Sequence, residues 1–188
     1  MSAGSVLLVA MPWETLPKPS IQLGTLQAVL ERAGIPTAVR SMKLAFMEHC
    51  RAATAGGPAA ERIEPSDYEA VAAEHFGVGL GDWIFAVPPF REGPDPDTAY
   101  LHYARERGVP EPALVKAQAM RRLVPAFVEA CVADILGAGP RVVGFTSAFS
   151  QNVASLVLSR RLKEADPTLR VVFGGANCEG PMGAALHR

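Results

Sequence analysis

The chain has 188 residues, 49% of them hydrophobic, and its 18 basic and 19 acidic side chains give a formal net charge of −1. This length suits one domain, whose core is large enough to fold without disulfides or a structural metal. The charge balance provides no basic field for nucleic acid, and three widely spaced cysteines suit the reducing cytoplasm, where we expect the protein.

The first part of the chain predicts a strand, a helix and a second strand. Residues 5–11, SVLLVAM, form a continuous apolar run that is typical of a strand buried on both faces. Prolines keep the next stretch irregular up to Ser20, which caps a helix that ends near Gly34. Residues 36–41 form the second strand. No early segment reaches the roughly 20 apolar residues of a spanning helix, so we expect no membrane partner.

A long insertion separates this unit from the next clear strand. The gap is about a hundred residues, whereas a crossover needs only about a dozen, so we expect a mainly helical insertion over about 43–140. Within it, residues 51–64 predict an irregular loop and Ser66 predicts the cap of a short helix. The longest helical periodicity covers 113–136, where Pro125 predicts a kink or a split.

The last third of the chain repeats the order of strand, helix and strand. The strands are expected at 141–146 and 170–175, with the helix near 151–165 between them. This alternation predicts an α/β fold with a parallel, doubly wound sheet. Ligands of such sheets bind beyond the carboxyl ends of the strands. The loops expected there cover 12–20, 147–152 and 174–180.

Several common chemistries lack their sequence signature. The glycines of 77–82 follow a predicted helix and not a strand, so they do not form a dinucleotide fingerprint. The four histidines have no ligand-like spacing, which predicts no metal site. Cys178 follows a strand near an expected helix N-terminus, where thiol pKa values fall, and is therefore a candidate nucleophile. The other interpretation of Cys178 is a small residue that fills a tight turn.

The turn after the last strand has the composition of a ligand loop. Gly174 and Gly175 carry no side chain where the strand ends, and residues 176–179 offer backbone amides and polar groups. Thr146 and residues 147–152 lie on the neighbouring loop. This arrangement suits a large, amide-rich, partly flat ligand whose tail lies against the sheet. An ordinary tight connection is the other interpretation, and spacing does not decide between them.

Three segments of the chain read LLVAMPWETLPKPSIQLGTLQAVLERAGI, VVGFTSAFSQNVASLVLSRRLKE and VVFGGANCEGPMG. Together they resemble the N-terminal part of cobalamin-binding radical SAM proteins, in the branch that matures ribosomally synthesised, bacteriocin-type peptides. The similarity covers about 5–45 and 141–185. It implies a Rossmann-like cobalamin module, whose nucleotide tail lies beside a Ser/Thr-bearing loop after the third strand and a glycine pair after the fourth.

The resemblance also implies which residues contact the cofactor. Modules of the methionine synthase type carry DxHxxG after the first strand, but this chain has PWETLPKPS there. Cobalamin is therefore expected base-off, without a histidine ligand. The expected cofactor-binding residues are Pro12, Trp13, Glu14, Thr15, Thr146, Ser147, Ala148, Phe149, Gln151, Asn152, Gly174, Gly175, Ala176, Asn177, Cys178 and Glu179.

The function that the resemblance implies is part of a B12-dependent radical SAM enzyme that C-methylates a precursor peptide. The whole enzyme would also hold a 4Fe–4S cluster and S-adenosylmethionine, but its CxxxCxxC motif lies downstream of this module. We therefore expect residues 1–188 to be one domain, a fragment or truncated product, that is not catalytic alone. A fifth strand is also missing, and the exposed edge predicts a homodimer. The alternatives are a protein or leader-peptide docking module with a degenerate ligand site, and a small cysteine enzyme that uses Cys178.

Overall fold

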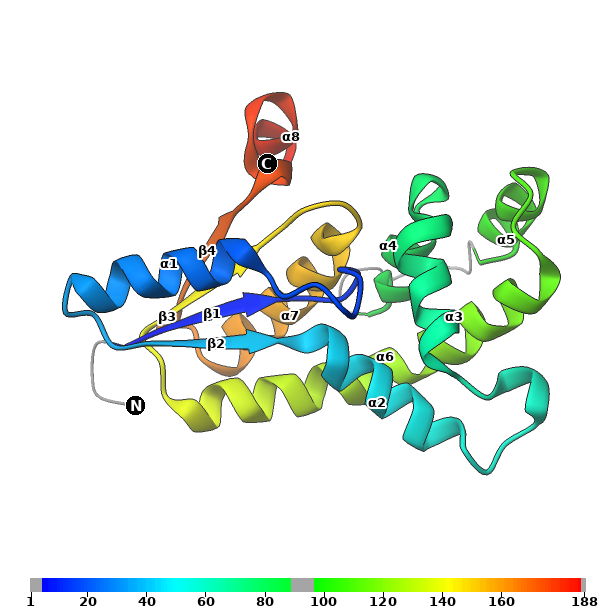
Figure 1. Ribbon diagram of the computed structural model, residues 1–188, viewed down its shortest axis with the longest axis horizontal. Helices are drawn as coiled ribbons and strands as arrows, with labels where there is room; N and C mark the ends of the chain where they lie inside the picture. The colour runs from blue at the N-terminus through cyan, green and yellow to red at the C-terminus, as the bar shows by residue number, and fades with distance from the viewer. Residues whose placement is uncertain (1–4, 89–96, 187–188) are drawn as a thin grey trace.

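The computed structural model describes residues 5–88 and 97–186, which form a parallel sheet with helices on both faces (Figure 1). The strands are β1 (Val6–Ala10), β2 (Thr37–Ser41), β3 (Val142–Thr146) and β4 (Arg170–Gly174). Their order is β2-β1-β3-β4, and all three pairings are parallel. The predicted α/β fold, with a four-stranded, doubly wound, Rossmann-like sheet, is confirmed.

Most of the helices lie between β2 and β3, as the expected insertion requires. The helices are α1 (Ile21–Arg32), α2 (Met42–Thr54), α3 (Pro65–Glu69), α4 (Leu80–Phe85), α5 (Asp97–Glu106), α6 (Glu111–Ala138), α7 (Gln151–Ala165) and α8 (Gly180–Leu186). Shorter helical turns are η1 (Ala59–Glu61), the π-helical η2 (Ala70–Glu74), η3 (Phe76–Val78) and η4 (Ala176–Cys178). None of the described helices is both long and apolar enough to cross a membrane.

The two faces of the sheet are covered unequally. Alternate side chains of β1 point to opposite faces, so Leu7 and Val9 enter the main core with the inserted helices and α7. Leu8 and Ala10 pack instead against α1, which covers β1 and β2. Beyond α1 the face of β4 is open, and the side chain of Val172 is 56% exposed. A ligand therefore has access to the sheet on this side.

Strand β4 is an edge strand in the part of the chain that the structure describes. It pairs with β3 alone. The helix that follows, α8, packs mainly against η4 and projects away from the sheet (Figure 1). The exposed sheet edge that we expected is therefore present in the described residues.

The structure corrects the start of one predicted loop in the insertion and the predicted split of its longest helix. The expected loop at 51–64 begins late, because α2 continues to Thr54, and the arginine and two alanines of 51–53 are good helix formers. Helix α6 is not split at Pro125 and runs without interruption past it. Val124 and Phe127 are buried on either side of the proline. Their packing offsets the backbone hydrogen bond that proline cannot make.

The predicted cap of the short helix in the insertion is also wrong. Helix α3 begins at Pro65, and Glu64, not Ser66, is its N-cap. The side chain of Asp67 accepts a hydrogen bond from the Glu64 N–H at 2.8 Å, while the Glu64 side chain accepts one from the Asp67 N–H. This reciprocal capping box, with proline in the first turn, fixes where the helix starts.

Candidate functional site

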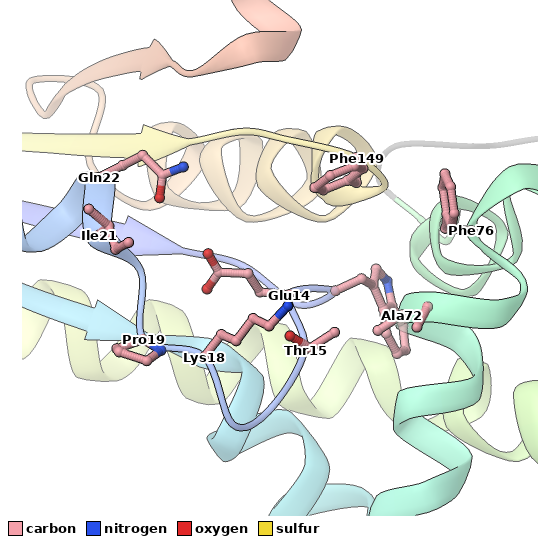
Figure 2. Close-up of a pocket in the computed structure, with 11 residues that line it drawn as sticks. Glu14, Thr15, Lys18, Pro19, Ile21, Gln22, Ala72, Phe76 and Phe149 are labelled. Carbon is pink, nitrogen blue, oxygen red and sulfur yellow. The ribbon is translucent and has the colours of Figure 1, made fainter.

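A cavity of about 590 Å³, here called the loop cavity, lies beyond the carboxyl ends of β1 and β3 (Figure 2). Its walls come from the β1–α1 connection, from η2 and η3 of the insertion, and from the β3–α7 loop. The lining residues are Trp13, Glu14, Thr15, Lys18, Pro19, Ile21, Gln22, Ala72, Ala73, Phe76 and Phe149. The inserted helices therefore complete a cavity at the edge of the sheet where α/β proteins bind ligands.

A second hollow, here called the sheet groove, has a volume of about 310 Å³ and lies between α1 and the ends of β3 and β4. Its lining is mostly apolar and consists of Leu8, Gln22, Leu23, Leu26, Gly144, Phe145, Thr146, Val172, Phe173, Gly174 and Gly175. Gln22 lines both hollows. The sheet groove and the loop cavity therefore adjoin at this side chain.

Gly174 and Gly175 serve different purposes. A Cβ placed on Gly174 would meet no atom within 4 Å. A Cβ on Gly175 would lie 2.5 Å from the carbonyl oxygen of Ser147 and 2.9 Å from its nitrogen, and the φ of Gly175 is +104°. Gly175 is therefore required for close packing between two loops. Only Gly174 leaves space at the end of the strand.

Buried polar side chains join the β3–α7 loop to the turn after β4. The hydroxyl of Ser147 donates to Oδ1 of Asn152 at 2.5 Å. Nδ2 of Asn177 donates to the Ser147 hydroxyl at 3.2 Å and to the Phe149 carbonyl at 2.9 Å. Ser147 and Asn177 are both buried. These predicted contact residues therefore bond mainly to one another.

Gln151 joins the same loop to β1. Its side chain is buried, and its Nε2 donates to the carbonyl of Met11 at 2.7 Å. Its Oε1 accepts a hydrogen bond from the N–H of Ala148 at 3.0 Å. Thr146 is also buried, but it lines the sheet groove. The ends of β1, β3 and β4 are thus held together by hydrogen bonds between their loops.

Two of the four predicted residues after β1 belong to the interior. Pro12 is buried, and Trp13 is 2% exposed, with its indole N–H donating to the carbonyl of Gly81 at 3.0 Å. Glu14 and Thr15 are partly exposed and line the loop cavity. Trp13 therefore forms part of the cavity wall from within the core.

Sequence reasoning missed Lys43, which fixes the β1–α1 connection. This lysine of α2 is 4% exposed, and its Nζ donates to the carbonyl of Thr15 at 2.9 Å and to that of Lys18. It also forms a salt bridge with Glu14 at 3.3 Å. The available signal was a lysine on the apolar face of the segment MKLAFMEHC, at helical spacing from Phe46.

The exposed part of the turn after β4 gives no support to thiol chemistry. Ala176 and Glu179 are exposed, and Cys178 is partly exposed. Burial raises the pKa of the Cys178 thiol, so the predicted lowering at a helix N-terminus is wrong. His187, the base considered for this cysteine, lies outside the described residues.

Residues 77–82, which do not form a dinucleotide fingerprint, connect the insertion to α7. Their last residue, Asp82 on α4, accepts a hydrogen bond from the N–H of Val153 in the first turn of α7, at 3.4 Å. Burial raises the pKa of this carboxyl. Asp82 thereby joins the insertion to the helix that follows the β3–α7 loop.

Comparison with known proteins does not identify the site. Comparison of the chain with protein-family models, with curated proteins and with solved structures finds no match. Across residues 5–88 and 97–186, no three His, Cys, Asp or Glu side chains come together as metal ligands would. What the protein binds is therefore inferred from the two hollows and from the sequence resemblance.

Proposed function

We propose that this chain binds cobalamin, as the cofactor domain of a cytoplasmic, B12-dependent radical SAM enzyme that C-methylates a ribosomally synthesised peptide. The observation that carries the proposal is the pair of adjoining hollows at the carboxyl ends of the strands. One is wide and the other is a groove against the sheet. Cobalamin has two matching parts, a broad corrin ring and a nucleotide tail.

The lining of the loop cavity suits a corrin ring. The rings of Phe76 and Phe149 offer apolar surface to its flat face. Glu14, Lys18 and Gln22 surround the cavity with donors and acceptors for the amides at its periphery. A cavity with apolar walls and a few polar groups is the usual form of a cofactor site.

The sheet groove suits a nucleotide tail. Its floor is apolar, and Gly174 leaves the end of β4 without a side chain. Thr146 places a hydroxyl beside it. No histidine lines either hollow in the described part of the chain, and we propose that cobalamin binds base-off. Cobalamin would supply the methyl-transfer chemistry, and this chain would orient it and exclude water.

Titration of the purified chain with hydroxocobalamin tests the proposal. The wild type should give a saturable change in the visible absorbance bands. Gly174→Leu places a side chain in the groove at a position where an added Cβ meets no atom within 4 Å, and it should weaken binding by roughly tenfold or more, about 1.4 kcal/mol. Gly137→Leu is the matched control, because Gly137 is also unobstructed but lies on α6 and lines neither hollow.

A wild-type chain that leaves the absorbance bands unchanged would refute the cofactor proposal.

The second candidate function, docking of a protein or leader peptide, is favoured by the open edge of β4 and the exposed Val172. Docking of a second copy there would appear in sedimentation as a dimer that Val172→Asp dissociates.

A further inference from the structure

Phe149 has a strained backbone that its own packing does not explain. Its φ is +49°, and it is the one non-glycine residue with positive φ in the described part of the chain. A bulky residue in this region is an outlier. The side chain is 70% exposed, so burial of the ring offsets little of the strain. Strain that the fold maintains at a cavity indicates a functional role.

The surrounding fold holds Phe149 in this conformation. Its carbonyl accepts a hydrogen bond from Nδ2 of the buried Asn177 at 2.9 Å. Two residues later, Gln151 anchors the loop to the end of β1 through the carbonyl of Met11. Both contacts connect the loop to separate strands, so the loop cannot relax by itself.

The ring of Phe149 lies beside a second exposed aromatic ring. Phe76 belongs to the insertion, is 48% exposed, and lines the same loop cavity. The two ring centroids are 5.9 Å apart and the planes meet at 76° (Figure 2). Two aromatic rings from distant parts of the chain thus stand at the wall of one cavity, each with about half or more of its surface available to a ligand.

We infer that Phe76 and Phe149, in edge-to-face contact with each other, form one aromatic wall, here called the aromatic clamp, that contacts the ring of the ligand independently of the sheet groove. The inference rests on the proposed cobalamin function and adds that these two rings contribute to binding of the corrin ring separately from the groove that holds the nucleotide tail. The loop cavity recognises the corrin macrocycle, and the sheet groove recognises the nucleotide tail. The insertion contributes Phe76, so it takes part directly in cofactor binding.

Two corrinoid probes separate these contributions. Hydroxocobalamin has both ring and tail, whereas diaquacobinamide has the ring without the nucleotide tail. Phe149→Ala and Phe76→Ala should each weaken binding of both probes by a similar factor, roughly tenfold. Gly174→Leu should weaken binding of hydroxocobalamin alone. Tyr103→Ala is the control, because Tyr103 is a partly exposed aromatic residue that lines neither hollow.

A stability measurement distinguishes a clamp from ordinary packing. Phe149→Gly and Phe149→Ala both remove the ring, but only glycine adopts positive φ without strain. The urea midpoint of the chain without ligand should therefore be higher for Phe149→Gly than for Phe149→Ala, while both variants bind corrinoids more weakly than the wild type. A midpoint of Phe149→Gly at or below that of Phe149→Ala would show that this position is not strained, and would remove the argument for the clamp.

The outcomes for the proposed function and for the clamp differ. A wild-type chain that binds neither probe refutes the cobalamin function and the clamp with it. A wild-type chain that binds both probes, with Phe149→Ala and Phe76→Ala unchanged in affinity, refutes the clamp alone. An effect of Phe149→Ala confined to hydroxocobalamin also refutes it, since the contact would then be to the tail.

Discussion

Replacing each of two adjacent glycines by alanine should have opposite effects on stability. In Gly175→Ala, the new methyl group would lie 2.5 Å from the carbonyl oxygen and 2.9 Å from the nitrogen of Ser147. These are backbone atoms that cannot rotate away, so the two loops must separate. The hydrogen bond from the Ser147 N–H to the Gly174 carbonyl, 2.7 Å long, bridges the same contact and would be stretched.

The loss of stability in Gly175→Ala has two sources. Alanine at a φ of +104° is strained by roughly 1–3 kcal/mol. Overpacking against backbone adds roughly 1–3 kcal/mol. We therefore expect the free energy of unfolding to fall by about 2–6 kcal/mol. In Gly174→Ala the methyl group meets nothing within 4 Å, and stability should be unchanged or higher by up to about 1 kcal/mol, because alanine restricts the unfolded chain.

Urea unfolding followed by far-ultraviolet circular dichroism measures both effects in the same way. The two positions are neighbours, so each variant is the control for the other. Equal stability of the two variants, or a loss below about 0.5 kcal/mol in Gly175→Ala, within the range of ordinary surface substitutions, would refute the close contact between the two loops.

Three further predictions concern buried groups around the site. Lys43→Met removes a buried donor from two loop carbonyls and should lower the free energy of unfolding by roughly 1–3 kcal/mol in urea; an unchanged value would contradict the anchoring role. Asp82→Asn keeps an acceptor for α7 but removes a carboxyl whose burial raises its pKa. The folded wild type therefore binds this proton more tightly than the unfolded chain, and it loses stability relative to the variant as the pH rises through the raised pKa. The difference in urea midpoint should be smallest below pH 3.8, and a difference that grows toward acid would be inconsistent with burial as the cause. Burial also raises the pKa of the Cys50 and Cys131 thiols to about 12. In the native protein only Cys178 should therefore react with a chromogenic disulfide, and it should react more slowly than free cysteine. A second thiol that reacts fast would contradict the burial of Cys50 and Cys131.

The order of the elements could be predicted because each is marked by local pattern. The helix expected near 151–165 is observed over those residues, and the strand expected at 141–146 begins one residue later. Continuous apolar runs and helical periodicity are properties of short segments, and they survive in the fold. The continuation of α6 past Pro125 could not be predicted. It depends on the packing of the residues beside the proline, Val124 and Phe127, against parts of the core that are distant in sequence.

The position of the site could be predicted, but the roles of its residues could not. Topology places three loops at one edge of the sheet, which needs only the order of strands. Which side chains face the cavity depends on contacts between segments far apart in sequence. Lys43 lies 29 residues from Glu14, and Asn177 lies 28 residues from Phe149. No local pattern reports such contacts.

The buried network changes which residues can meet a ligand. Ser147, Gln151 and Asn177 were expected to bond a cofactor, but their polar atoms already have partners in neighbouring loops. A ligand that used them would first have to break those bonds, and a buried group left unsatisfied costs roughly 1–3 kcal/mol. The polar contacts to a ligand should therefore come from the more exposed cavity-lining side chains, Glu14, Lys18 and Gln22. Loops that are fixed before binding also lose little entropy on binding, and the same hydrogen bonds keep Phe149 in a conformation that a free loop would leave.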